Sequence, residues 1–120
     1  SCKDDETENE LVKDRIVGTW DFVSFKLDGD EYMGTIVDSS TITFKAYTAA
    51  QGDFDHDIVY ADGEREELKG KYSVNETKKE LVMIAGQQRD TIKLSFPNAD
   101  KMEWVGKQDG EPLVAKAERQ

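Results

Sequence analysis

The feature that most constrains this chain is a repeated pattern of short, strand-like segments separated by turn residues. Segments begin about every 10 to 15 residues, and a long helical period is absent. The pairs Asp62-Gly63 and Asp109-Gly110 predict tight type I′ hairpins, because Asp-Gly tolerates positive φ angles. The predicted strands span 16–27, 41–47, 54–60, 66–74, 80–85, 89–96, 101–107 and 112–118.

These segments predict one all-β domain. Eight antiparallel strands joined by short turns are best arranged as a closed up-and-down barrel, since closure leaves no exposed strand edges. A short helical turn over 11–15 precedes the first strand. We therefore expect residues 11–120 to form the barrel domain.

Alternation of apolar and polar residues assigns the two faces of each strand. Phe54, His56 and Tyr60, for example, share a face opposite Asp53 and Asp55. The inward residues are rich in aromatic side chains, which are the candidate ligand-binding residues. This candidate set is Trp20, Phe44, Phe54, His56, Tyr60, Tyr72, Phe96 and Trp104.

The alternation pattern is compatible with two kinds of barrel interior. An eight-stranded barrel can be filled by its own side chains or can hold one small ligand. Segment 30–40 is unusually apolar for a connection, with Tyr32, Met33, Ile36 and Val37, and is a candidate lid over the barrel mouth. A barrel with a cavity would bind a small hydrophobic or amphipathic molecule, whereas a packed barrel would serve as a protein–protein interaction module.

Two segments are apolar on both predicted faces. Val23, Phe25 and Leu27 lie opposite Trp20 and Phe22, and Val82 and Ile84 lie opposite Leu81 and Met83. A strand that is apolar on both faces is usually covered on both. The cover would be the N-terminal turn, segment 30–40 or a second copy of the protein, so a homodimer is one expected assembly.

Composition and motifs exclude several functions. The net charge of −10 argues against nucleic acid, because phosphate binding needs a positive face. Residues 53–64 imitate the ligand spacing of a calcium loop, but Ile58 occupies the position that requires glycine, so we predict no metal site. We also predict no cofactor and no catalytic residues, since a single histidine without a nucleophile motif does not make an enzyme.

His56 has two interpretations. It could be a polar contact for a ligand head group in a hydrophobic cavity. It could equally be a buried histidine whose hydrogen bonds are satisfied within the protein.

The first strand carries a family resemblance. Gly18-Thr19-Trp20, placed after a helical turn at the start of an eight-strand meander, resembles the opening of lipocalins and the wider calycin group. The resemblance implies that Trp20 closes the barrel floor and that Gly18 allows close backbone approach. It also implies a basic residue near the last strand, Arg119 or Lys116, stacked over Trp20, and a small hydrophobic ligand.

The N-terminus carries a second resemblance. Cys2, the single cysteine, is followed by Lys3-Asp4-Asp5-Glu6, which resembles the signal after the acylated cysteine of surface lipoproteins in one group of Gram-negative bacteria. It implies a small bacterial lipocalin-like lipoprotein. Cys2 would carry the lipid that contacts the membrane, residues 1–10 would be a flexible tether, and the protein would be displayed on the bacterial outer membrane.

Overall fold

A computed structural model describes residues 11–108 and 110–120, so Cys2, the expected tether and Asp109 lie outside the described residues. No helix in the described part of the chain is long and apolar enough to cross a bilayer. The elements are α2 (Val12–Arg15), β1 (Gly18–Leu27), β2 (Asp30–Glu31), β3 (Val37–Phe44), β4 (Gly52–Tyr60), β5 (Arg65–Asn75), β6 (Glu80–Ala85), β7 (Gln88–Asn98), β8 (Lys101–Gln108) and β9 (Glu111–Arg119).

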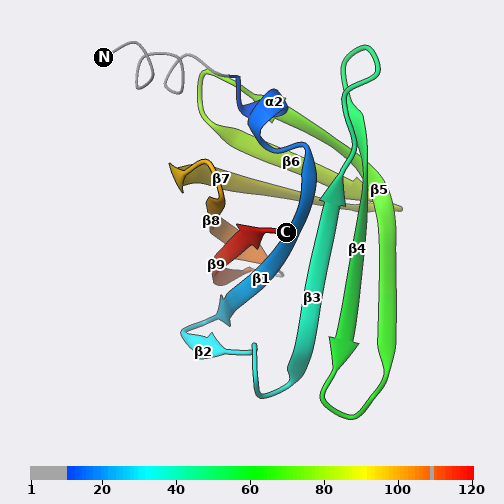
Figure 1. Ribbon diagram of the computed structural model, residues 1–120, viewed down its shortest axis with the longest axis vertical. Helices are drawn as coiled ribbons and strands as arrows, with labels where there is room; N and C mark the ends of the chain where they lie inside the picture. The colour runs from blue at the N-terminus through cyan, green and yellow to red at the C-terminus, as the bar shows by residue number, and fades with distance from the viewer. Residues whose placement is uncertain (1–10, 109) are drawn as a thin grey trace.

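The strands form a closed antiparallel barrel, as predicted. Each strand from β3 to β8 pairs with the next, and β1 pairs with both β3 and β9, which closes the sheet. The short β2 pairs only with the end of β1, so eight strands make the barrel wall. Figure 1 shows α2 at one end of the barrel and β2 with the β4–β5 turn at the other. We call these ends the floor and the mouth.

The turns differ in detail from the prediction. Residues 61–64 connect β4 to β5, and only Gly63 of the Asp62-Gly63 pair has a positive φ. The hairpin is present but its predicted type I′ geometry is wrong, because the connection has four residues rather than two. Within it the Asp62 carboxylate accepts a hydrogen bond from the Glu64 N–H. Asp28 and Gly29 instead form the two-residue turn with two positive φ angles, and this turn creates β2.

The expectation that the first strand is apolar on both faces is wrong, because β1 contains a bulge. Phe22 pairs with Ala117 but Ser24 pairs with Lys116, so Val23 is the extra residue. The bulge reverses the inside–outside alternation after Phe22. Phe25 and Leu27 therefore pack against the core, whereas Val23 is 50% exposed on the outside. On β6, Ile84 faces outward and is 38% exposed.

The floor is built around Trp20. Its side chain is fully buried, and its indole Nε1–H donates to the Ile16 carbonyl at 2.9 Å. The Arg119 guanidinium lies 4.3 Å from the Trp20 ring centroid and donates to the carbonyls of Val17 (2.8 Å) and Arg15 (2.5 Å). Arg119 is thus the stacking residue that the resemblance implied, and Lys116 is exposed on the outside.

Gly18 fits this arrangement for a steric reason. It has a φ of +129°, and a Cβ at this position would lie 2.6 Å from the Arg119 guanidinium. Any side chain would therefore strain the backbone and displace the arginine.

Helix α2 is held over the floor by one carboxylate. Glu76, in the β5–β6 turn, accepts hydrogen bonds from the backbone N–H of Val12 (2.8 Å) and of Lys13 (3.0 Å). These amides have no partner within the helix, because the first turn leaves its N–H groups free. The contact also buries Val12 against the core.

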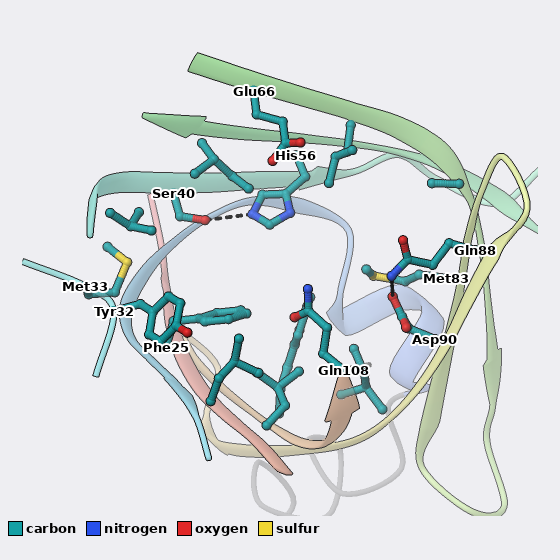
Figure 2. A pocket seen from close by; sticks show the side chains of 18 of the residues that line it. Phe25, Tyr32, Met33, Ser40, His56, Glu66, Met83, Gln88, Asp90 and Gln108 are labelled. Atoms are coloured by element: carbon teal, nitrogen blue, oxygen red, sulfur yellow. Dashed lines mark hydrogen bonds between the residues drawn. The ribbon is translucent and has the colours of Figure 1, made fainter. Parts of the chain in front are cut away.

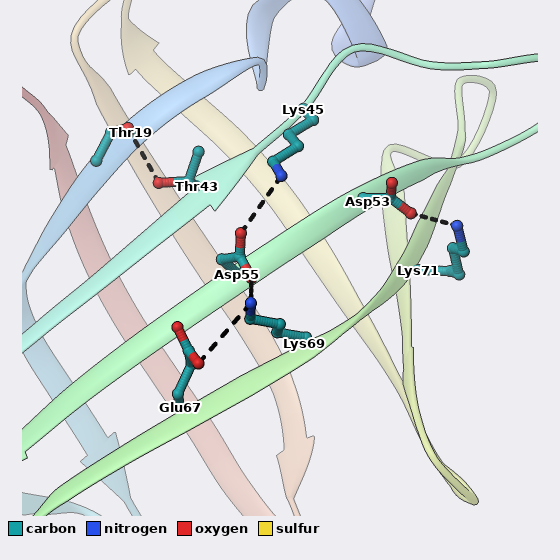
Figure 3. Close-up of polar contacts among 8 residues, drawn as sticks. All are labelled: Thr19, Thr43, Lys45, Asp53, Asp55, Glu67, Lys69 and Lys71. Carbon is teal, nitrogen blue, oxygen red and sulfur yellow. Dashed lines mark hydrogen bonds and ion pairs between the residues drawn. The ribbon is translucent and has the colours of Figure 1, made fainter.

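The acidic face of β4 is paired with lysines. Figure 3 shows Asp53 beside Lys71, and Asp55 between Lys45 (3.6 Å) and Lys69 (3.9 Å). Of the carboxylates that imitate a calcium loop, Asp53, Asp55 and Asp57 are therefore spread along β4, and Asp53 and Asp55 are paired with lysines. Glu64 lies in the turn after the strand. Within 11–108 and 110–120, no group of three or more potential ligands converges on a metal position.

We expect Arg119→Met to destabilise the protein by about 2 kcal/mol, because it removes charged hydrogen bonds and a cation–π contact while keeping the aliphatic stem. Denaturant-induced unfolding measures the effect. Lys116→Met on the exposed face of β9 is the matched control and should change stability by less than about 0.5 kcal/mol. Equal stabilities for the two variants would contradict the role of Arg119 in closing the floor.

Candidate ligand-binding site

The barrel is not filled at its mouth end. A cavity of about 350 Å³ opens there, between the floor core and the turns that border the mouth. Its wall is largely apolar, with a few polar side chains from several strands (Figure 2). Apolar lining residues include Phe25, Leu27, Met33, Ile58, Met83 and Leu113, and the polar ones include Ser40, His56, Glu66, Gln88, Asp90 and Gln108.

The predicted binding residues divide between this cavity and the floor. Those that line the cavity are Phe54, His56, Tyr60 and Trp104. Those that lie elsewhere in the barrel interior are Trp20, Phe44, Tyr72 and Phe96. Both sets face inward, as alternation predicted, but alternation does not tell the floor end of a strand from its mouth end.

The members of the floor set contact one another. Tyr72 packs edge-on against Phe44, with ring centroids 4.9 Å apart, and Phe96 lies 6.2 Å from Trp20. Phe96 is also covered by the Arg15 guanidinium at 4.5 Å. These rings form the base on which the cavity rests.

Sequence reasoning missed several lining residues for identifiable reasons. Phe25 and Leu27 are inward only because of the bulge at Val23, which has no sequence signature here. Glu66 and Asp90 continue the inward phases of β5 and β7, set by Leu68 and Ile92. The alternation of the sequence predicts this inward orientation, but the charge of the two side chains favoured the solvent face.

His56 and Ser40 form a buried polar pair in the wall. They are 8% and 6% exposed, and Ser40 Oγ lies 2.7 Å from His56 Nε2 (Figure 2). Burial lowers the pKa of His56 to about 4, against the opposing effect of the Asp57 and Glu66 carboxylates. The imidazole is therefore neutral at pH 7 and offers hydrogen bonds without charge.

The Ser40–His56 contact has the spacing of a nucleophile and its base. A hydrolytic pair needs a base whose pKa lies near the working pH and a third group that orients the ring. The pKa of His56 is too low, and no carboxylate among the described residues is hydrogen-bonded to its imidazole.

Trp104 lines the cavity with part of its ring, but its indole N–H lies in the packed interior. Trp104 is 2% exposed and packs edge-on against Phe22, with centroids 4.9 Å apart. Its indole Nε1–H is buried without a hydrogen-bond partner among the described residues. Leaving a buried donor unpaired costs about 1 to 3 kcal/mol, and this nitrogen has no surface that faces the cavity.

The segment expected to act as a lid does border the mouth, although 37–40 belong to β3. Tyr32, Met33 and Ile36 line the cavity. Glu31 fixes this segment: its carboxylate accepts hydrogen bonds from Ser24 Oγ (2.5 Å) and from the backbone N–H groups of Phe25 (2.7 Å) and Met33 (3.3 Å). Burial alone raises the pKa of Glu31, but these hydrogen bonds outweigh it and hold the pKa below its usual value.

Comparison with known proteins identifies the same architecture. Residues 16–104 match the family model described as a lipocalin-like domain. No curated protein matches the chain by sequence.

Solved structures of several barrels are similar. A de novo designed fluorescence-activating β-barrel is 23% identical, with a TM-score of 0.67 over 92% of this chain and 99% of that one. A redesigned β-barrel, mFAP1, bound to DFHBI is 15% identical, with a TM-score of 0.66 over 92% and 100%. The siderocalin Ex-FABP, described as functioning through dual ligand specificities, is 9% identical, with a TM-score of 0.63 over 88% and 74%. At these identities the likeness concerns the fold.

The pKa of His56 predicts how stability depends on pH. Its folded value of about 4 lies below the usual 6.5, so protonation favours the unfolded chain. The contribution of the neutral His56 to the free energy of unfolding is complete above about pH 6.5. It is lost as pH falls towards 4, and the whole loss is about 3 kcal/mol. His56 is the single histidine, so the loss between pH 6.5 and 5 should disappear in His56→Gln.

Denaturant unfolding at several pH values provides the measurement. The control is Ser40→Ala, which keeps the imidazole and should retain the pH dependence. An unfolding free energy that is flat between pH 6.5 and 5 in the wild-type protein would contradict a buried, neutral His56.

Proposed function

Because the chain belongs to the family of lipocalin-like domains, we propose that it is a binding protein that holds a small hydrophobic or amphipathic molecule inside its barrel. The observation that carries the proposal is the cavity of about 350 Å³ at the mouth. Its size and mostly apolar wall are typical of small-molecule sites, where a few polar groups fix orientation. The unfilled interior favours this function over the alternative of a packed interaction module.

The wall offers two kinds of contact to such a ligand. Aromatic and aliphatic side chains, such as Phe25, Phe54 and Met83, would bury its apolar body. A neutral polar group, the Ser40–His56 pair, would hydrogen-bond to it. The redesigned barrel bound to DFHBI is a precedent for a ligand complex in a similar fold. The activity proposed is reversible binding, without covalent chemistry.

We propose further that the barrel is attached to the outer membrane of a bacterium through lipid on Cys2 and faces outward. The support is the run Cys2-Lys3-Asp4-Asp5-Glu6 and its resemblance to the signal of surface lipoproteins. Because the thiol is the acylated group, Cys2→Ala expressed with a secretion signal should leave the membrane fraction and appear as soluble protein. Ser1→Ala is the control. A Cys2→Ala protein that still fractionates with membranes would contradict the anchor.

Blocking the cavity tests the binding function. Nile red, a neutral dye whose emission rises in apolar sites, should bind the wild-type protein. Ala85→Trp places a large ring in the cavity wall and should weaken dye binding at least about tenfold, since the added volume competes with the dye.

Val114→Trp is the matched control. Val114 is 41% exposed on the outside of β9, so the same ring there should leave dye affinity unchanged. Equal affinities of the two variants for the dye, with both folded by circular dichroism, would overturn binding inside the barrel.

A further inference from the structure

The charges at the mouth have one predominant sign. Among the described residues that line the cavity, the charged side chains are Glu66, Asp90 and Lys107. Two of the connections at the mouth, residues 28–36 and 61–64, add five carboxylates and no lysine, arginine or histidine, while Arg65 and Arg89 stand at the mouth ends of β5 and β7. Those five are Asp28, Asp30, Glu31, Asp62 and Glu64.

Two of the carboxylates are held where a ligand would pass them. Glu66 accepts a hydrogen bond from the Tyr60 hydroxyl at 2.7 Å, which places it beside an aromatic ring of the cavity wall. Asp90 is half-buried and accepts a bond from the Gln88 amide at 3.3 Å. Figure 2 shows Glu66 on one side of the cavity and Asp90 on another.

Aromatic side chains accompany these carboxylates. Phe25 and Tyr32 line the mouth with ring centroids 6.5 Å apart, and Tyr60 lies next to Glu66. Aromatic faces attract cations through the ring quadrupole and are used to recognise substituted ammonium groups. Carboxylates and aromatic rings at one opening therefore favour a positive group and disfavour a negative one.

Deeper in the cavity, the polar groups carry no charge. The neutral Ser40–His56 pair can meet a neutral polar atom, but it cannot compensate a buried carboxylate or ammonium. A charged group on the ligand would therefore stay at the mouth.

Given that the barrel binds a small molecule as proposed above, we propose that this ligand is a cationic amphiphile. Its apolar body occupies the cavity, and its amine or other positively charged group lies at the mouth beside Glu66 and Asp90. Anionic amphiphiles of the same size are rejected. A carboxylate at the mouth would face several negative groups in the cavity wall and one lysine, Lys107.

Three probes with a common naphthalene body separate charge from apolar burial. These are 2-naphthylmethylamine, 2-naphthylmethanol and 2-naphthoate, each titrated calorimetrically at neutral pH. We expect the amine to bind more tightly than the alcohol, and at least about tenfold more tightly than the carboxylate. The amine preference should shrink at high salt, because the mouth is open to solvent.

Paired variants locate the effect. Glu66→Gln combined with Asp90→Asn removes two charges at the mouth and should abolish the advantage of the amine over the alcohol. Asp57→Asn combined with Glu67→Gln removes two charges from a facing pair on the outside of β4 and β5. This second variant has the same net charge and should keep the amine preference.

The outcomes are distinguishable from those for binding itself. If Nile red binds but the amine is no tighter than the alcohol, the charge inference is overturned and the binding function stands. The charge inference is also overturned if the carboxylate binds best, or if the outer variant rather than the mouth variant loses the preference. If neither Nile red nor any naphthyl probe binds, both proposals fall.

Discussion

The structure depends on the closure of β1 onto β9 at the floor of the barrel. The register brings Trp20 opposite Arg119, and the Arg119 side chain then reaches back over the Trp20 ring to the carbonyls of Arg15 and Val17. One side chain from the end of the chain thus satisfies backbone acceptors and covers the central aromatic ring near its beginning. Closure removes the edges of the sheet, and the capped tryptophan gives the barrel a solid end.

The floor and the mouth follow different packing rules. At the floor, buried rings such as Trp20, Phe44 and Tyr72 fill the interior, and α2 covers them. Towards the mouth, β1 separates from β3. Its ladder with β3 ends at Asp21, and its last residues pair with β2 instead. Segment 32–36 crosses this opening, fixed by Glu31. The interior is therefore packed at one end and open at the other, which creates a binding site without weakening the base.

Polar groups in this barrel are sorted by depth. Asp53, Asp55 and Glu67 on the outer face lie beside lysines in solvent, where such pairs contribute little to stability. The buried Ser40–His56 pair is neutral. Carboxylates that face inward, Glu66 and Asp90, lie near the opening. Charged groups lie near solvent and neutral ones in the interior because removing a charge from water is costly. The opening is therefore the place where charge can select a ligand.

The sequence alone determined the fold class, because turn residues and period-two alternation specify antiparallel strands and their inward faces. It also determined that Trp20, Phe54, His56 and Trp104 point inward, and the resemblance to lipocalins implied that Arg119 or Lys116 stacks on Trp20. Only the tertiary structure decided which inward residues line a cavity, since alternation is the same at both ends of a strand. Phe25 entered the wall through a bulge, and Glu66 and Asp90 entered it despite their charge. Whether a barrel is full or open depends on the summed volumes of side chains from every strand, which local patterns do not contain.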